Sequence, residues 1–455
     1  MKKTIYLLLF ILLNIIFYSA NSCACISFEN ASWIDSLELT RNIFFSILIL
    51  YVSEFILSKT LSFLNTLNWS NELPEELSKI YDKDKYSKSM DYEKTKYKFS
   101  TISSLLWFNV MVLILLFSWF WELYNYLHNF TSNIILITLY FFWIITFFQT
   151  IISLPFSYYS TFVIEEKFWF NKMTKKMFFM DSIKSILLTV LIGWWILALI
   201  TWIYTITWNS FWLYTWWVVT FFSVFMMMFY SSLIVPLFNK QTPLKEWKLR
   251  DEIEAFASSV WFTLDNIYVI DWSKRSTKAN AYFSWFGPKK RIVLYDTLIS
   301  DLTNNELVAV LAHEIGHYKR KHTIQMLVFW MIQTWIMLFI LWLALRFPEV
   351  SKALWAFEGN FAVWLVAFGI LYTPISIIFG LLGSILSRKN EYQADEFAWL
   401  NYKPEKLKSA LIKLSRNNLS NLRPHPAYEF FYYSHPTVLK RIKALDSIKT
   451  KKVKS

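Results

Sequence analysis

Seven long apolar stretches constrain this chain more than any other feature of its sequence. They cover about residues 43–63, 103–121, 133–156, 184–206, 211–235, 326–346 and 361–387. Each approaches or exceeds the ~20 residues that a helix needs to cross a bilayer. The chain is 55% hydrophobic and only 17% charged, which argues against an ordinary soluble multidomain enzyme. We therefore predict an all-α multi-pass membrane protein with seven transmembrane helices.

The basic residues between these stretches indicate how the chain is oriented in the membrane. The connections 64–100 and 157–183 are rich in lysine, whereas 122–132 and the short connection around Asn209 contain neither lysine nor arginine. The segments 236–325 and 388–455 are again rich in both. Because basic loops favour the cytoplasmic side, we expect a protein of the plasma or inner cell membrane with both large segments in the cytoplasm. The net charge of +13 fits this orientation, and we expect no nucleic-acid partner.

The same pattern divides the chain into five parts. Residues 1–22 resemble a secretory signal, either cleaved or retained as an anchor. Residues 40–235 carry the first five spans, 236–325 form a water-facing catalytic insert, 326–387 carry the last two spans, and 388–455 form a C-terminal catalytic helical region. Any chemistry is expected where the insert and the C-terminal region meet. Cys23 and Cys25 are too close for an ordinary disulfide.

A metal-binding motif lies inside the insert. Thr303 and Glu306 form a capping-box pattern that predicts the start of a helix, which continues through LVAVLAHEIGHYKRKH. His313 and His317 are spaced i, i+4, so both imidazoles share one helical face and can bind one Zn²⁺. Glu314 is placed to take a proton from a water that the metal activates. A chance match is improbable in a chain with only 6 histidines.

A catalytic zinc normally has a third protein ligand. Glu391 is the best candidate, because Glu349 and Glu358, which lie between the motif and Glu391, are expected on the opposite side of the membrane. Asp395 on the same helical face would orient a zinc histidine. His435 and His425 remain competing ligands. We expect His322 to point away from the ligand face.

His435 and Arg441, in the segment SHPTVLKRI, form a further feature. Either side chain, if close to the metal, would stabilise the oxyanion of a tetrahedral intermediate. The alternatives are a turn residue for His435 and a contact with lipid headgroups for Arg441.

The chain resembles the integral-membrane CAAX prenyl proteases of type I, which are seven-span zinc endopeptidases of the gluzincin type. The segments that carry the resemblance run in order over roughly residues 40–445 and include LPFSYY, VIEEKF, PLFNK, IYVID, SKRS, NAYF, KKRIVLYDTL, LAHEIGH, EYQAD and SHPTVLKRI.

The resemblance implies a role for several residues. Glu391 would be the third zinc ligand, with Asp395 supporting the site, and His435 and Arg441 would contact the substrate or the intermediate. Asn280 and Ala281 would lie on a small edge strand or hairpin that pairs with the substrate backbone. The signal-like N-terminus indicates a bacterial member of the family.

We therefore predict a zinc metalloendopeptidase with one Zn²⁺ per chain, acting on peptides or membrane proteins within the lipid bilayer. Whether its substrates are prenylated, and its oligomeric state, are left open. The alternatives are a shorter heat-shock type of membrane protease (HtpX-like) and a metal-binding transporter.

Glycine and tryptophan occur in unusual amounts. The chain has only 7 glycines but 24 tryptophans, whereas glycine usually makes up roughly 7% of a protein. Where the related proteases have glycine, this chain has Trp169, Trp247, Trp261, Trp272 and Trp285. We hypothesise that these are glycines in the cell, encoded by a reassigned UGA codon. None of the predicted zinc-site residues is affected.

Overall fold

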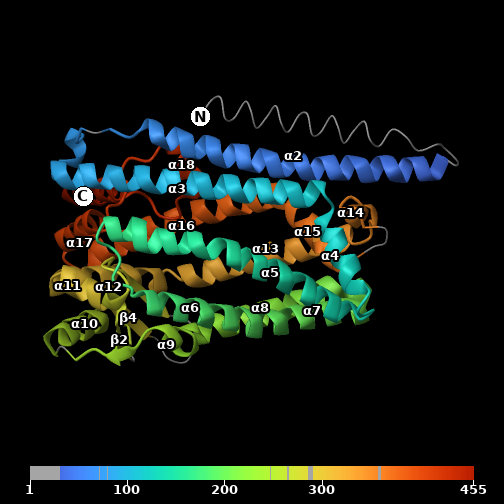
Figure 1. The fold of residues 1–455 in the computed structure, drawn as a ribbon. Helices are drawn as coiled ribbons and strands as arrows, with labels where there is room; N and C mark the ends of the chain where they lie inside the picture. The colour runs from blue at the N-terminus through green and yellow to red at the C-terminus, as the bar shows by residue number, and fades with distance from the viewer. Residues whose placement is uncertain are drawn as a thin grey trace.

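The computed structural model describes residues 31–454 apart from 71, 79, 246, 264–265, 285–290 and 357–359. The signal-like segment 1–22 therefore lies outside the described residues. Long helices run side by side along the molecule (Figure 1). The α-helices of the first half, long and short, are α2 (Ala31–Leu67), α3 (Lys83–Leu116), α4 (Trp119–His128), α5 (Ile134–Tyr159), α6 (Lys175–Leu188), α7 (Trp194–Thr207), α8 (Phe211–Leu233) and α9 (Val235–Phe238).

The second half contains shorter helices around two further long ones. They are α10 (Trp247–Ser259), α11 (Asp296–Asp301), α12 (Asn304–Lys319), α13 (His322–Ala344), α14 (Glu349–Lys352), α15 (Phe361–Leu371), α16 (Thr373–Asn401), α17 (Pro404–Asn417), α18 (Pro426–Tyr432) and α19 (Val438–Lys454). Each apolar stretch predicted from the sequence is helical, although the boundaries differ. The stretch predicted to end near residue 121 is interrupted, because Ser118 adopts a left-handed conformation (φ 54°) between α3 and α4.

Five helical segments among the described residues are long and apolar enough to cross a membrane, or six if a bent pair is counted as one span. The bent pair is α15 and α16, which meet at an angle of 54°, so the stretch predicted at 361–387 is two helices. One of the five segments, Lys175–Phe238, has 64 residues and contains α6, α7 and α8. A short 3-10 turn, Trp208–Ser210, separates α7 from α8, and these two helices contact each other.

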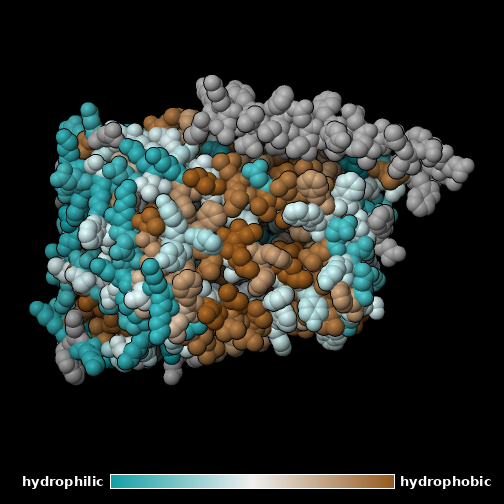
Figure 2. Space-filling model, viewed as in Figure 1, coloured by the Kyte–Doolittle hydropathy of each residue, from teal (hydrophilic) through white to brown (hydrophobic). Residues whose placement is uncertain are grey.

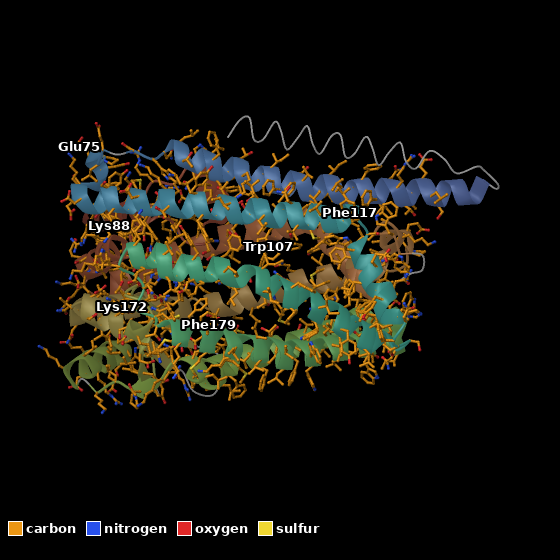
Figure 3. The ribbon with its side chains drawn as sticks, viewed as in Figure 1. Glu75, Lys88, Trp107, Phe117, Lys172 and Phe179 are labelled. Carbon is orange, nitrogen blue, oxygen red and sulfur yellow. The ribbon has the colours of Figure 1, made fainter. Side chains whose placement is uncertain are left out.

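The polarity of the surface changes along the length of the bundle. Figure 2 shows hydrophobic side chains across the middle of the molecule and hydrophilic ones at the end that holds α10, α11, α12 and α17. In Figure 3, Glu75, Lys88 and Lys172 lie at this polar end, whereas Trp107 and Phe179 lie in the apolar middle. The insert and the C-terminal region therefore share the polar end of the bundle.

The insert contains a four-stranded mixed sheet, which is more β-structure than the expected edge strand or hairpin. Its strands are β1 (Gln241–Pro243), β2 (Asn266–Ile270), β3 (Ala281–Ser284) and β4 (Arg291–Tyr295), in the order β1-β2-β4-β3. β2 and β4 are parallel, and the two outer strands pair antiparallel to them. Ile292, Val293 and Leu294 of β4 are buried, as expected for a central strand covered on both faces.

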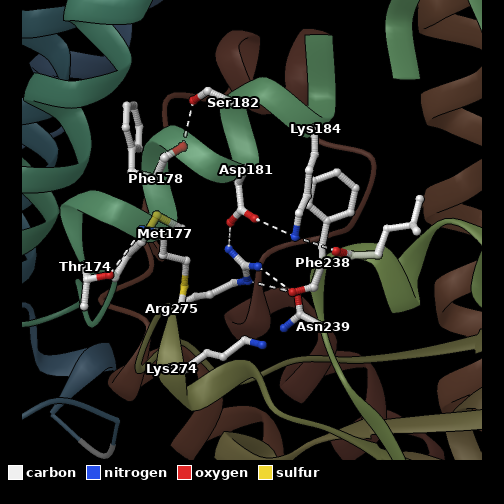
Figure 4. A network of polar contacts seen from close by, with 12 residues as sticks. Thr174, Met177, Phe178, Asp181, Ser182, Lys184, Phe238, Asn239, Lys274 and Arg275 are labelled. Carbon is white, nitrogen blue, oxygen red and sulfur yellow. Dashed lines mark hydrogen bonds and ion pairs between the residues drawn. The ribbon is translucent and has the colours of Figure 1, made fainter. Parts of the chain in front are cut away.

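A buried arginine connects the insert to the membrane helices (Figure 4). Arg275, which follows the 3-10 turn Trp272–Lys274, donates hydrogen bonds to Asn239 Oδ1 at 2.9 Å and to the Phe238 carbonyl at 2.6 Å. It also forms an ion pair with Asp181 of α6. Because each of these groups is satisfied by a partner, the buried charge is compensated, and the sheet is fixed against α6 and α9.

Helix α12 packs against α16 and α17 in the polar end. Leu249 and Ile253 of α10 and Leu307 and Leu311 of α12 belong to the same buried apolar cluster as Leu294 of β4. The helix that carries the predicted metal motif is therefore held between the sheet and the C-terminal helices.

Candidate metal centre

The N-terminus of α12 is fixed by the capping box that the sequence predicts. The backbone N–H of Thr303 donates to Glu306 Oε2 at 2.8 Å, and both halves of the box are present. From α17, Ser409 donates to Glu306 at 2.5 Å and Lys413 Nζ at 2.7 Å. Although burial opposes ionisation, these hydrogen bonds lower the pKa of Glu306 to about 2. The cap therefore sets both the start of α12 and its contact with α17.

Three side chains from two helices, α12 and α16, converge beside one another. His313 Nε2 lies 3.1 Å from His317 Nε2, and Glu391 Oε1 of α16 lies 3.2 Å from His317 Nε2. His313 Nε2 is 3.5 Å from Glu391 Oε2. Zinc bonds of about 2.0–2.1 Å in tetrahedral geometry place neighbouring donor atoms roughly 3.3–3.4 Å apart. The two imidazoles and the carboxylate therefore have the spacing to hold one zinc ion, and we call these three residues the metal-binding group of the described chain.

The second nitrogen of His313 contacts a buried ion pair. His313 Nδ1 lies 2.8 Å from Asp395 Oδ1, one helical turn beyond Glu391 on α16. Arg441 of α19 contacts Asp395 through Nε at 2.8 Å and Nη2 at 2.6 Å, and its Nη1 lies 3.3 Å from Glu391 Oε2. Arg441 is buried, so it does not face lipid headgroups. Its nitrogens contact protein carboxylates behind the metal-binding group.

Glu314 and His435 line a cavity of about 560 Å³ beside Glu391. Burial raises the pKa of the Glu314 carboxyl above its ordinary value. His435 Nε2 lies 3.3 Å from Glu391 Oε1, and Ser434 Oγ lies 2.9 Å from His435 Nδ1. If Ser434 donates to Nδ1, the ring proton is on Nε2, the nitrogen that faces the cavity.

Two residues near the site have contacts that the sequence did not predict. His322 is outside the described metal-binding group, as expected, but it lies against His317, with 3.0 Å between their Nδ1 atoms. The expectation that it points away from the ligand face assumed one continuous helix, but α12 ends at Lys319 and Lys321 is left-handed (φ 58°). Asn390 lines the same cavity and is buried, and its Nδ2 has no hydrogen-bond partner within the described part of the chain.

Other candidate residues lie elsewhere. His425 caps α18, where its side chain accepts a hydrogen bond from the N–H of Ala427 at 3.2 Å, and it is not in the described metal-binding group. Ala281 begins β3 at one edge of the sheet. Its N–H donates to the Oδ1 of the preceding Asn280 at 2.8 Å.

Comparisons with known proteins agree with this architecture and this site. A family model for the N-terminal region of CAAX prenyl proteases, with five membrane helices, matches residues 63–240, and the model of peptidase family M48 matches residues 243–449. CAAX prenyl protease 1 of Saccharomyces cerevisiae is 33% identical over 411 residues, which are 84% of this chain and 90% of the relative. The Oryza sativa homologue is 37% identical over 393 residues, or 84% of this chain and 91% of the relative. The crystal structure of S. mikatae Ste24p has a TM-score of 0.84 at 32% identity, covering 89% of this chain and 99% of that chain.

Proposed function

Because this chain belongs to the CAAX prenyl proteases of peptidase family M48 and is a membrane zinc metalloendopeptidase, we propose that His313, His317 and Glu391 hold its single catalytic Zn²⁺. The observation that carries this proposal is the convergence of two Nε2 atoms and a carboxylate within 3.1–3.5 Å of one another. When bound, zinc supplies a Lewis acid and makes a water nucleophilic near neutral pH.

Glu314 is the general base in this proposal. It lines the cavity beside Glu391 and follows the ligand His313 directly in the sequence, as a base for a metal-activated water requires. Glu314 takes a proton from the attacking water and passes it to the leaving amine. His435 Nε2–H, at the same cavity, donates a hydrogen bond to the oxyanion that develops on the scissile carbonyl.

Asp395 and Arg441 act behind the ligands. Asp395 accepts the Nδ1–H of His313, which leaves Nε2 free for the metal. Arg441 compensates the charges of Asp395 and Glu391. The three guanidinium nitrogens contact these carboxylates. Arg441 therefore acts by positioning the site, and the direct contact with the substrate that the resemblance implies stays a prediction.

The substrate backbone is proposed to add to the free edge of β3. The N–H of Tyr295 donates to the Asn280 carbonyl at 3.3 Å, and Ala281 faces Leu294 in the next pair. Because hydrogen-bonded pairs alternate in antiparallel sheets, the N–H and C=O of Ala281 point away from β4. Asn280 Oδ1 occupies this N–H in the free protein, and a bound peptide would replace it.

The relatives' name suggests the first substrates to test. The protein would act on peptides or membrane proteins, and C-terminal CAAX peptides with and without a prenyl group separate CAAX processing from general endopeptidase activity. The comparisons favour this assignment over the shorter heat-shock type of protease. They also favour it over a metal-binding transporter.

Catalysis is tested with the purified protein in detergent. We expect about one zinc per chain, cleavage of a quenched peptide, and complete loss of cleavage in Glu314→Gln with zinc retained. Glu396→Gln, an exposed carboxylate on α16 paired with Arg320, is the matched control and should keep full activity. Equal activity of Glu314→Gln and the wild type would contradict the proposal.

The proposed topology has seven spans, with the insert and the C-terminal region in the cytoplasm. It counts the 64-residue segment as two spans that turn at Trp208–Ser210, together with the bent α15–α16 pair as one. The division of the chain at residues 235, 325 and 387 stays part of this proposal. Labelling of single cysteines at Lys88 and His128, in a protein whose Cys23 and Cys25 are replaced by serine, tests it, because only the Lys88 site should be accessible from the cytoplasm.

A further inference from the structure

We propose that His322 and Gln393 form a neutral hydrogen-bond relay that fixes the tautomer and the ring orientation of the zinc ligand His317. The proposal rests on the zinc site proposed above. It assigns a positioning role to two residues that lie outside the H-E-x-x-H motif and that hold no metal themselves.

The relay joins three helices at the metal centre. His322 Nδ1 lies 3.0 Å from His317 Nδ1, and His322 Nε2 lies 2.9 Å from Gln393 Oε1. His317 belongs to α12, His322 is the first residue of α13, and Gln393 lies on α16 two positions after Glu391. Each end of the relay is therefore attached to an element that also carries a zinc ligand.

The turn between α12 and α13 brings His322 back to His317. Lys321 adopts a left-handed conformation (φ 58°), which separates α12 from α13. His322 is then 2% exposed. A buried imidazole needs a partner for each ring nitrogen, and here the partners are His317 and Gln393.

The protons of the relay are fixed by the metal site. A histidine binds zinc through a nitrogen without a proton. The Nε2 of His317 faces His313 and Glu391, so Nδ1 of His317 must carry the proton. His322 Nδ1 must then accept this hydrogen bond, and His322 Nε2–H must donate to Gln393 Oε1. Every donor has an acceptor only when the hydrogen bonds run from His317 through His322 to Gln393.

The two zinc histidines are therefore held in different ways. His313 donates to the carboxylate of Asp395, whose charge Arg441 compensates. His317 donates to the neutral His322. Asp395 adds negative charge next to its ligand, whereas the relay provides only an acceptor with a fixed direction. We infer that His322 acts by orienting His317 and by excluding its other tautomer.

His322 is not placed as a fourth zinc ligand. Its Nε2 is occupied by Gln393, and its Nδ1 faces the nitrogen of His317 that points away from Glu391. It is also absent from the metal-binding group found among the described residues. Orientation by hydrogen bonding is the role that this geometry supports.

The test compares His322→Leu with His322→Asn. Leucine fills the space without an acceptor, whereas the asparagine Oδ1 takes approximately the place of Nδ1. The zinc dissociation constant is measured by competition with a fluorescent chelator at one fixed neutral pH. Thermal unfolding of the metal-free proteins and the visible spectrum of the Co²⁺-loaded proteins are recorded in parallel.

We expect His322→Leu to bind zinc about 10–100-fold more weakly than the wild type and to show an altered Co²⁺ spectrum. His322→Asn should recover most of the loss, and Gln393→Leu should weaken binding less than His322→Leu. His128→Leu, an exposed histidine at the end of α4, is the control and should bind zinc as the wild type does.

Three results would overturn the relay. One is wild-type zinc affinity in His322→Leu, and another is equal affinity of the leucine and asparagine variants. The third is a loss of metal-free stability without any change in affinity or spectrum, which would indicate packing alone. A wild-type protein that binds no zinc would contradict the proposed function and this relay with it. Normal zinc binding without peptide cleavage would contradict only the proposed catalysis.

Discussion

Gly316 of α12 and Ala394 of α16 approach so closely that a Cβ on Gly316 would lie 3.1 Å from the Cα and the carbonyl oxygen of Ala394. This contact lies between the two helices that supply His317 and Glu391. The backbone of α16 would have to move by a few tenths of an ångström to admit a larger residue. The distance between the zinc ligands therefore depends on a glycine inside the motif.

We expect Gly316→Ala to lower stability by about 1–3 kcal/mol and to weaken zinc binding. The control is Gly380→Ala on α16, since a Cβ there meets no described atom within 4 Å and alanine favours a helix interior. Thermal unfolding and zinc competition measure both effects. Equal stability and zinc affinity in the two variants would contradict the contact.

Glu306 should make stability depend on pH. Its pKa is lowered from 4.5 to about 2, so the ionised carboxylate stabilises the fold above pH 4.5, and this contribution is lost as the pH falls towards 2. We expect Glu306→Gln to cost about 3 kcal/mol near neutral pH and progressively less at acidic pH. Glu405→Gln, an exposed carboxylate on α17, should cost little at any pH. Unfolding curves across this range test the prediction, and a constant cost would contradict it.

Arg441 should matter most when zinc is removed. It lies between Asp395 and Glu391 at 2.6–3.3 Å, and its loss leaves two buried carboxylates without their cation. We expect Arg441→Leu to cost about 3–5 kcal/mol in the metal-free protein and less with zinc, because the metal also compensates Glu391. Melting curves with chelator and with excess zinc measure the difference. An equal cost in both conditions would argue against this role.

Replacing Asn390 is expected to raise stability and to lower activity. Its Nδ2 is buried without a partner among the described residues, which costs about 1–3 kcal/mol. We expect Asn390→Leu to raise the melting temperature of the free protein while lowering kcat/KM, because the amide would donate to a bound substrate. Unchanged kcat/KM would exclude that contact.

Trp169 and Trp261 occupy backbone positions that normally require glycine. Their φ values are 68° and 54°, and Trp355, which the sequence comparison did not single out, has φ 70°. In each case the backbone N–H of the next residue donates a hydrogen bond to the carbonyl of the residue five positions before it, as Phe262 does to Ala257 at 2.8 Å. This is the helix C-terminal motif in which glycine predominates.

The remaining tryptophans of the hypothesis give no such evidence. Trp247 begins α10 and Trp272 begins a 3-10 turn, while Trp285 lies outside the described residues. The left-handed backbone conformation therefore supports the hypothesis at only some of the five tryptophans.

We expect Trp261→Gly to raise stability by about 1–2 kcal/mol, since a left-handed conformation costs a residue with a Cβ roughly this amount. Trp261 is 92% exposed, so little packing is lost. Trp261→Ala keeps a Cβ and should gain much less. Equal gains in stability for the glycine and alanine variants would contradict the explanation by backbone conformation. UGG codons at these positions would rule out the hypothesis of a reassigned UGA codon.

The sequence by itself determined the properties that depend on neighbouring residues. The length of the apolar stretches predicts helices that can span a membrane, and the capping box at Thr303 and the i, i+4 spacing of His313 and His317 predict their helix and their common face. These features hold because hydrogen bonding and side-chain direction in a helix repeat within one or two turns.

Only the tertiary structure decided which residues far apart in the sequence lie next to one another. Glu391 and Asp395 reach the histidines because α16 packs against α12 at Gly316. His322 meets His317 and Gln393 because the left-handed Lys321 separates α12 from α13. The mixed sheet and the bend between α15 and α16 likewise depend on contacts with other elements. No local pattern encodes these meetings, since they follow from how the helices pack and not from the spacing of residues along one of them.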